Sequence, residues 1–107
     1  MPKLSKRYLS PIKMKLLIDS LWEAICCLQN KKEVRQFFSD LLTEMEVRML
    51  AKRLGIAERL LEGKLYTEIM EELKVINRTV AEVNKKLKYG RGGYQMVIER
   101  LQRNGKS

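Results

Sequence analysis

Apolar residues recur at helical spacing along most of the chain, and no pair of segments carries the signal of a β-hairpin. Ser10 and Pro11 form a typical helix start, a capping side chain followed by a proline, and the helix is expected to run to about Leu28. Its apolar positions extend well beyond one face, for example at Ile18 and Trp22. Such a helix must be covered on several sides, which favours burial between two subunits, with a central helix in a monomer as the alternative.

Two more helices are predicted between residues 31 and 62. Asn30 can cap the first, over residues 31–42. Thr43 and Glu46 are spaced as a capping box and open the second, which ends at Gly63. The core face predicted for this helix consists of Val47, Leu50, Ala51, Leu54, Ala57, Leu60 and Leu61.

Two short helical segments then follow, joined by only three residues, so that a helix-turn-helix is predicted at about residues 66–87. Buried positions are expected at Ile69, Met70, Leu73, Val75, Val80, Val83 and Leu87. The turn departs from the usual pattern because Lys74 stands where glycine would adopt positive φ, at a cost of about 1 kcal/mol. Ile76 occupies the expected cap position, so Asn77 is predicted to be the cap. An ordinary helical hairpin would use the same apolar spacing.

The second of these helices leaves polar and small side chains on its outer face. Side chains of this kind can reach base edges in the major groove, while flanking lysines reach phosphates. The candidate DNA-contacting residues are Asn77, Arg78, Ala81, Glu82 and Lys85 toward the bases, with Thr79, Lys86 and Lys88 toward the phosphates.

The chain is expected to form one domain over residues 10–104, preceded by a basic, flexible arm at residues 1–9. Residues 89–93 contain three glycines and predict a flexible break. A last helix is expected from Tyr94 to about Arg103, packing through Met96, Val97, Ile98 and Leu101.

The net charge of +9 is concentrated at the two ends of the chain. Residues 1–15 carry five basic side chains and no acid, residues 16–63 carry seven bases and eight acids, and residues 64–107 carry ten bases and five acids. A neutral middle between two basic ends is typical of a protein that binds a polyanion through regions outside its structural core. A basic surface that is merely solvated is the alternative.

The residue inventory argues against catalysis. The chain contains no histidine, and it carries no phosphate loop, metal-spaced cysteine cluster or nucleophile motif. Neither a cofactor nor a metal is expected. Cys26 and Cys27 are expected to be reduced thiols that pack as small apolar side chains, which together with the lack of a secretory segment favours the cytoplasm. No apolar stretch is long enough for a membrane span.

The chain resembles the Trp-repressor-like family, in its branch of uncharacterised regulators, over about residues 17–101. The resemblance rests on several runs: FSDLLTEME at 38–46, LAKRLGIA at 50–57, LLEGK at 60–64, VNKKLKYG at 83–90 and GGY at 92–94. It implies an all-α, six-helix fold in an intertwined homodimer that binds double-stranded DNA. Residues 43–87 also resemble region 4 of bacterial sigma factors.

The resemblance further implies where tryptophan would bind, since the founding member of the family holds it between two arginines. Arg53 matches the first arginine, but Glu82 stands at the position of the second, and Val83 follows where a glycine leaves room for the ligand. A carboxylate there repels the carboxylate of the amino acid. Tryptophan is therefore not expected to be the effector, whose identity the sequence does not reveal.

The sequence thus predicts a cytoplasmic, sequence-specific DNA-binding transcription regulator, a homodimeric repressor rather than an enzyme. The alternative is a helical module that binds proteins or RNA and has lost specific DNA reading. An exposed outer face on residues 77–86 would favour the first, because an interaction module would bury it.

Overall fold

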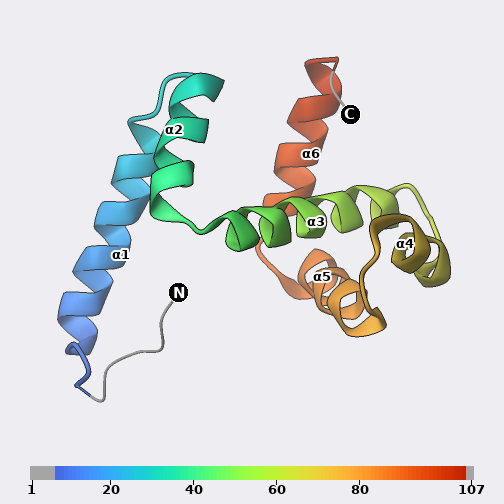
Figure 1. The fold of residues 1–107 in the computed structure, drawn as a ribbon, viewed down its shortest axis with the longest axis horizontal. Coiled ribbons are helices and arrows are strands. Elements are labelled where there is room, and N and C mark those ends of the chain that lie inside the picture. The colour runs from blue at the N-terminus through green and yellow to red at the C-terminus, as the bar shows by residue number, and fades with distance from the viewer. Residues whose placement is uncertain (1–6, 106–107) are drawn as a thin grey trace. The chain divides into compact units, whose positions relative to one another are not determined.

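The computed structural model describes residues 7–105, which form six helices and no strand, as the sequence predicts (Figure 1). The helices are α1 (Pro11–Cys26), α2 (Lys31–Leu41), α3 (Glu44–Leu61), α4 (Tyr66–Leu73), α5 (Asn77–Tyr89) and α6 (Gly93–Arg103). The described chain divides after Val47 into two compact units. Most of the predicted basic arm, residues 1–6, lies outside the described residues.

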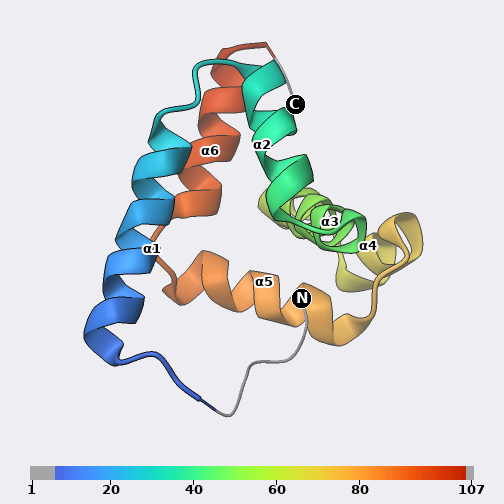
Figure 2. The ribbon, with the colours of Figure 1, turned by 60° about the vertical axis from the view of Figure 1, so that its left-hand side comes forward.

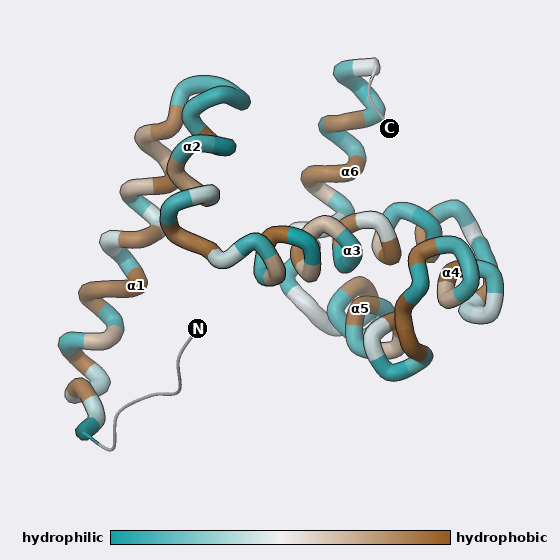
Figure 3. Tube along the Cα trace, in the orientation of Figure 1, coloured by the Kyte–Doolittle hydropathy of each residue, from teal (hydrophilic) through white to brown (hydrophobic). Residues whose placement is uncertain are grey.

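The N-terminal unit contains α1 and α2, and the chain reverses its direction between them (Figures 1 and 2). Both predicted caps are present. The Ser10 hydroxyl accepts a hydrogen bond from the Lys13 amide at 3.2 Å, and the Asn30 side chain accepts one from the Glu33 amide at 3.0 Å. Apolar positions recur along the whole of α1 (Figure 3), yet no residue of α1 or α2 is buried. This unit has no closed core of its own.

Cys26 and Cys27 are both free thiols, but they are exposed at the end of α1. The expectation that they pack as apolar core residues is therefore wrong for the single chain. The two cysteines are exposed because too little of the chain covers the end of α1, and Trp22 on the same helix is 58% exposed for the same reason.

The capping box at the start of α3 is confirmed. The Thr43 hydroxyl accepts from the Glu46 amide at 3.1 Å, and the Glu46 carboxylate accepts from the Thr43 amide at 2.8 Å. The backbone amide of Thr43, and to a smaller extent its side chain, lower the pKa of the Glu46 carboxyl from its usual value of 4.5. The other end of α3 passes into Gly63, which has a φ of 86°.

The C-terminal unit holds a closed apolar core to which α3, α4, α5 and α6 all contribute. The buried side chains are Ile56, Ala57, Ile69, Val80, Val83 and Ile98. Half-buried side chains surround them, namely Leu54, Leu60, Tyr66, Met70, Leu73, Val75, Leu87 and Tyr94. All seven positions predicted to be buried in the helix-turn-helix belong to one of these two groups.

The core face of α3 differs from the prediction. Ile56 is completely buried although it was not assigned to that face, whereas Val47, Leu50 and Leu61 are each more than two-fifths exposed. The part of α3 that faces α4 and α5 is buried, because side chains of those two helices cover it. In α6, likewise, Ile98 is buried but Met96 and Val97 are exposed.

The glycine-rich break is shorter than predicted. Tyr89 still belongs to α5, and Gly93 already begins α6, so only three residues separate the two helices. Gly92 adopts a φ of 78°, which glycine tolerates without strain. With this residue the chain turns sharply, and α6 points away from the axis of α5 (Figure 2).

Candidate nucleic-acid interface

The turn between α4 and α5 fixes how the second helix of the helix-turn-helix is presented. Lys74 adopts the left-handed conformation, with φ 55° and ψ 55°, at the position where the sequence predicts a strained residue. Ile76 is extended, and its carbonyl accepts from the amides of Thr79 and Val80, so it is the cap residue of α5. The prediction that Asn77 caps the helix is wrong. Backbone conformation sets the cap here, and Asn77 is already the first helical residue.

The turn is tied to α3 by a contact that spans 22 residues of sequence. The Lys52 ammonium donates a hydrogen bond to the Lys74 carbonyl at 3.2 Å. Close by, α3 and α4 approach at Gly55, where an added Cβ would lie 3.4 Å from Cδ1 of Leu73. No pattern in the sequence signals the lysine contact.

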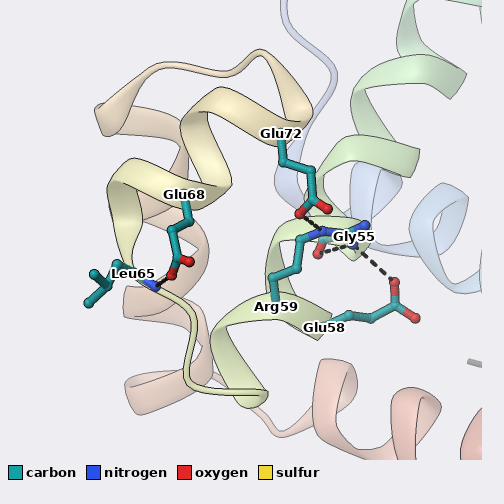
Figure 4. A network of polar contacts seen from close by, with 6 residues as sticks. All are labelled: Gly55, Glu58, Arg59, Leu65, Glu68 and Glu72. Carbon is teal, nitrogen blue, oxygen red and sulfur yellow. Dashed lines mark hydrogen bonds and ion pairs between the residues drawn. The ribbon is translucent and has the colours of Figure 1, made fainter.

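A polar network that includes Gly55 also joins α4 to α3 (Figure 4). Arg59 donates from Nε to the Glu72 carboxylate at 2.6 Å and from Nη1 to the Gly55 carbonyl at 3.0 Å. The Arg59 hydrogen bond lowers the pKa of Glu72 below its usual value of 4.5. At the start of α4, the Glu68 carboxylate accepts from the Leu65 amide at 2.9 Å. These contacts fix α4, and α4 in turn packs against α5.

The outer face of α5 is open to solvent, as a DNA-reading helix requires. Asn77, Arg78, Glu82, Lys85, Lys86 and Lys88 are exposed, while Thr79 and Ala81 are half-buried. Arg78 donates from Nε to a Glu82 carboxylate oxygen at 3.1 Å, one helical turn away. Among the described residues, the three lysines form no ion pair, so their charges are available to a polyanion.

A pocket of about 870 Å³ lies beside this face, lined by α3, α5, α6 and the glycine-rich turn. Arg53, Glu82 and Val83 all line it, so the three residues that the resemblance associates with tryptophan come together in space. Thr79 and Lys86 line the same pocket and therefore lie on one side of the outer face. Glu82 places an acid in this pocket, where the resemblance puts the second arginine, and Arg53, Lys86 and Arg91 are the basic side chains of its lining.

The C-terminal end of α5 involves two residues that the sequence did not single out, Tyr89 of α5 and Gln95 of α6. Tyr89 is 80% exposed and lies on α5 seven residues, or two helical turns, after Glu82. The sequence assigns it to a flexible break at residues 89–93, so it was not recognised as part of this helix. Gln95 of α6 donates from Nε2 to the Leu87 carbonyl at 2.8 Å and so caps this end of α5. No sequence signal pointed to that contact.

Residues 7–105 contain no group of three or more metal-ligating side chains. Within the same residues, no helix combines the length and the apolar character needed to cross a membrane.

The fold and the outer face define an all-helical protein with a helix-turn-helix whose second helix presents basic side chains. The family model described as "Trp repressor protein" matches residues 17–102. The chain belongs to this family.

Individual relatives agree with this assignment. The uncharacterised protein YerC of Bacillus subtilis (strain 168) is 36% identical over 84 residues, which are 78% of this chain and 81% of that protein. A solved TrpR-like protein from Eubacterium eligens ATCC 27750 has a TM-score of 0.77 at 34% identity, over 81% of this chain and 90% of its own. A Staphylococcus aureus structure, provisionally described as a Trp repressor, has a TM-score of 0.78 at 31% identity, over 89% and 96%.

Proposed function

We propose that the protein is a transcription regulator that binds double-stranded DNA in a sequence-specific manner and acts as a repressor. The observation that carries the proposal is the exposed outer face of α5, where Arg78, Lys85 and Lys88 point away from a closed core. An exposed helix with one arginine and several lysines suits the major groove, since the arginine can read a guanine edge and the lysines can neutralise phosphates. Catalysis and a cofactor form no part of this proposal.

The regulator is proposed to work as a homodimer. Neither α1 nor α2 has a buried residue, although α1 alone carries six large apolar side chains that are more than two-fifths exposed. Apolar surface on this scale destabilises an isolated chain in water and marks an interface. A second copy is the proposed covering surface, in keeping with the intertwined dimer that the family resemblance implies. It would also supply a second recognition helix, about 34 Å from the first, for a palindromic site.

The decisive experiment is selection of bound duplexes from a random pool at about 0.15 M salt, near physiological ionic strength. We expect enrichment of one palindromic site. Binding of the full chain to that site and to scrambled DNA is then measured for the wild type and for Arg78→Ala. The substitution should cost about 1–3 kcal/mol on the selected site and alter base preference there.

Equal losses on both duplexes would contradict base reading by Arg78. No enrichment of any duplex, together with tight binding to structured RNA, would instead support the RNA-binding alternative, because charge alone attracts both nucleic acids.

A further inference from the structure

The outer face of α5 contains an acid in the centre of its basic surface. Glu82 lies four residues after Arg78 and three before Lys85, so all three occupy one side of the helix. DNA phosphates border the groove that this face would enter, and a carboxylate there is repelled by every sequence. Glu82 therefore opposes general attraction to DNA. Any favourable contribution of Glu82 to DNA binding must therefore act through the arginine that it contacts or through particular bases.

The contact between Glu82 and Arg78 has a specific geometry. The carboxylate accepts the Nε–H of Arg78 at 3.1 Å, which leaves the two terminal Nη groups of the guanidinium unoccupied by that bond. The side chains are 83% and 61% exposed for Arg78 and Glu82, so the pair forms on the open surface. Because a guanidinium is planar, a bond at Nε also restricts the directions in which the remaining N–H groups can point.

Restricting the guanidinium in this way matters for base recognition. Guanine presents its O6 and N7 acceptors side by side in the major groove, and an arginine reads both only when two of its N–H groups point at them together. A free arginine on an exposed helix samples many rotamers and must lose that freedom on binding. Such an arginine can also bind any phosphate within reach instead of a base.

We propose that Glu82 is a positioning and specificity-determining residue, which holds Arg78 for guanine and weakens binding to all other DNA. The inference rests on the proposed DNA-binding function and names how its selectivity arises. Glu82 acts through Arg78. It lowers affinity through its charge, and it raises discrimination through its hydrogen bond.

Two substitutions separate these effects. Glu82→Gln removes the charge but keeps an oxygen that can accept from Nε, whereas Glu82→Ala removes both. Glu99→Gln is the matched control, because Glu99 forms the corresponding pair with Arg103 on α6, at 3.4 Å and the same spacing, and the change in net charge is identical. The full-length variants are compared on the selected duplex, on duplexes with each guanine replaced in turn, and on random DNA.

We expect both Glu82 variants to bind random DNA about threefold to tenfold more tightly than the wild type, while Glu99→Gln changes this affinity less. Discrimination at one guanine should fall about twofold to threefold in Glu82→Ala, the scale of an exposed pair one helical turn apart, and remain near wild type in Glu82→Gln. In an Arg78→Ala background, adding Glu82→Ala should not change discrimination further, since the arginine it positions is gone.

Other results would overturn the proposal. Unchanged discrimination in Glu82→Ala would exclude positioning. A loss that persists in the Arg78→Ala background would mean that Glu82 itself reads a base, for instance by accepting from a cytosine amino group. If the wild type shows no preference among duplexes, the proposed function fails as well. If the wild type binds one duplex selectively and the Glu82 variants discriminate equally well, only this inference fails and the proposed function stands.

Discussion

Lys74 is the one described residue other than glycine with a positive φ, and it lies in the turn of the helix-turn-helix. Left-handed backbone costs a residue with a side chain about 1–2 kcal/mol relative to glycine. Its carbonyl is held by Lys52 and its side chain pairs with Glu71 at 3.2 Å, but that pair is largely exposed. Exposed pairs contribute little, so the backbone term dominates at this position.

Replacing Lys74 should therefore reveal the strain. We expect Lys74→Gly to exceed Lys74→Ala in unfolding free energy by about 1 kcal/mol, because both variants lose the pair with Glu71 and only glycine relieves the strain. Urea denaturation of both variants measures the difference. An alanine variant as stable as the glycine variant would show that the turn adapts at no cost.

Glu82 has a second consequence at the residue scale, because it lines the pocket that also contains Arg53 and Val83. Arg53, Lys86 and Arg91 also line the pocket, but Glu82 stands where the resemblance puts the arginine that meets the ligand carboxylate, and its own carboxylate repels that group. Val83 occupies space beside it. We expect L-tryptophan neither to bind nor to change DNA affinity. Calorimetric titration with and without DNA tests this. Saturable binding at micromolar concentration, or a gain of about tenfold in DNA affinity, would refute it.

At the scale of the elements, α3 and α4 are joined by the pair of Arg59 and Glu72. This bond lowers the pKa of Glu72 in the folded chain. It therefore stabilises the fold at pH values above 4.5, the usual pKa of this carboxyl group. The stabilisation is lost as the pH falls through the lowered pKa, because the carboxyl must then be protonated. Glu46 at the start of α3 behaves in the same sense.

Glu72→Gln should flatten part of this acid dependence. We expect the unfolding free energy to fall less between about pH 5 and pH 3 in this variant than in the wild type, with a remainder contributed by Glu46. Chemical denaturation at a series of pH values gives the two slopes. Glu62→Gln, just after α3, is the control and should follow the wild type, because Glu62 forms no ion pair among the described residues. Identical slopes in all three proteins would exclude a role for the Arg59 contact.

The helices themselves could be predicted to within one or two residues, because their ends are local events. Ser10, Asn30 and Thr43 cap helices with their own side chains, and Gly63 ends one through its backbone freedom. Asn77 was misjudged, since an extended Ile76 takes the cap position without a side-chain bond.

The candidate site could be predicted only in part. The exposed positions of α5 follow from the same spacing that buries Val80 and Val83. By contrast, the bonds from Lys52 to Lys74 and from Arg59 to Glu72 join residues far apart in sequence. Periodicity also cannot distinguish Ile56, which other helices cover, from Leu50, which they leave 47% exposed.

At the scale of the whole molecule, the oligomeric state decides whether the exposed face of α1 is covered. We expect the protein to sediment at twice the mass of one chain at micromolar concentration. Ile18→Asp should shift it toward the monomer, because a charge in an apolar interface is not solvated. Ser20→Asp introduces the same charge at a position that is already polar and should disturb the dimer less. A folded wild-type monomer at that concentration would exclude the homodimer.

The missing core of α1 and α2 has a thermodynamic consequence. With a second copy as the covering surface, burial of these helices and association become one reaction, governed by mass action. The midpoint of thermal unfolding then rises with total protein concentration. In a cell, the abundance of the protein would then set its folded fraction as well as its occupancy of the operator. When cells grow without making new protein, dilution would lower both quantities together. DNA binding would therefore fall more steeply with concentration than a single binding equilibrium allows.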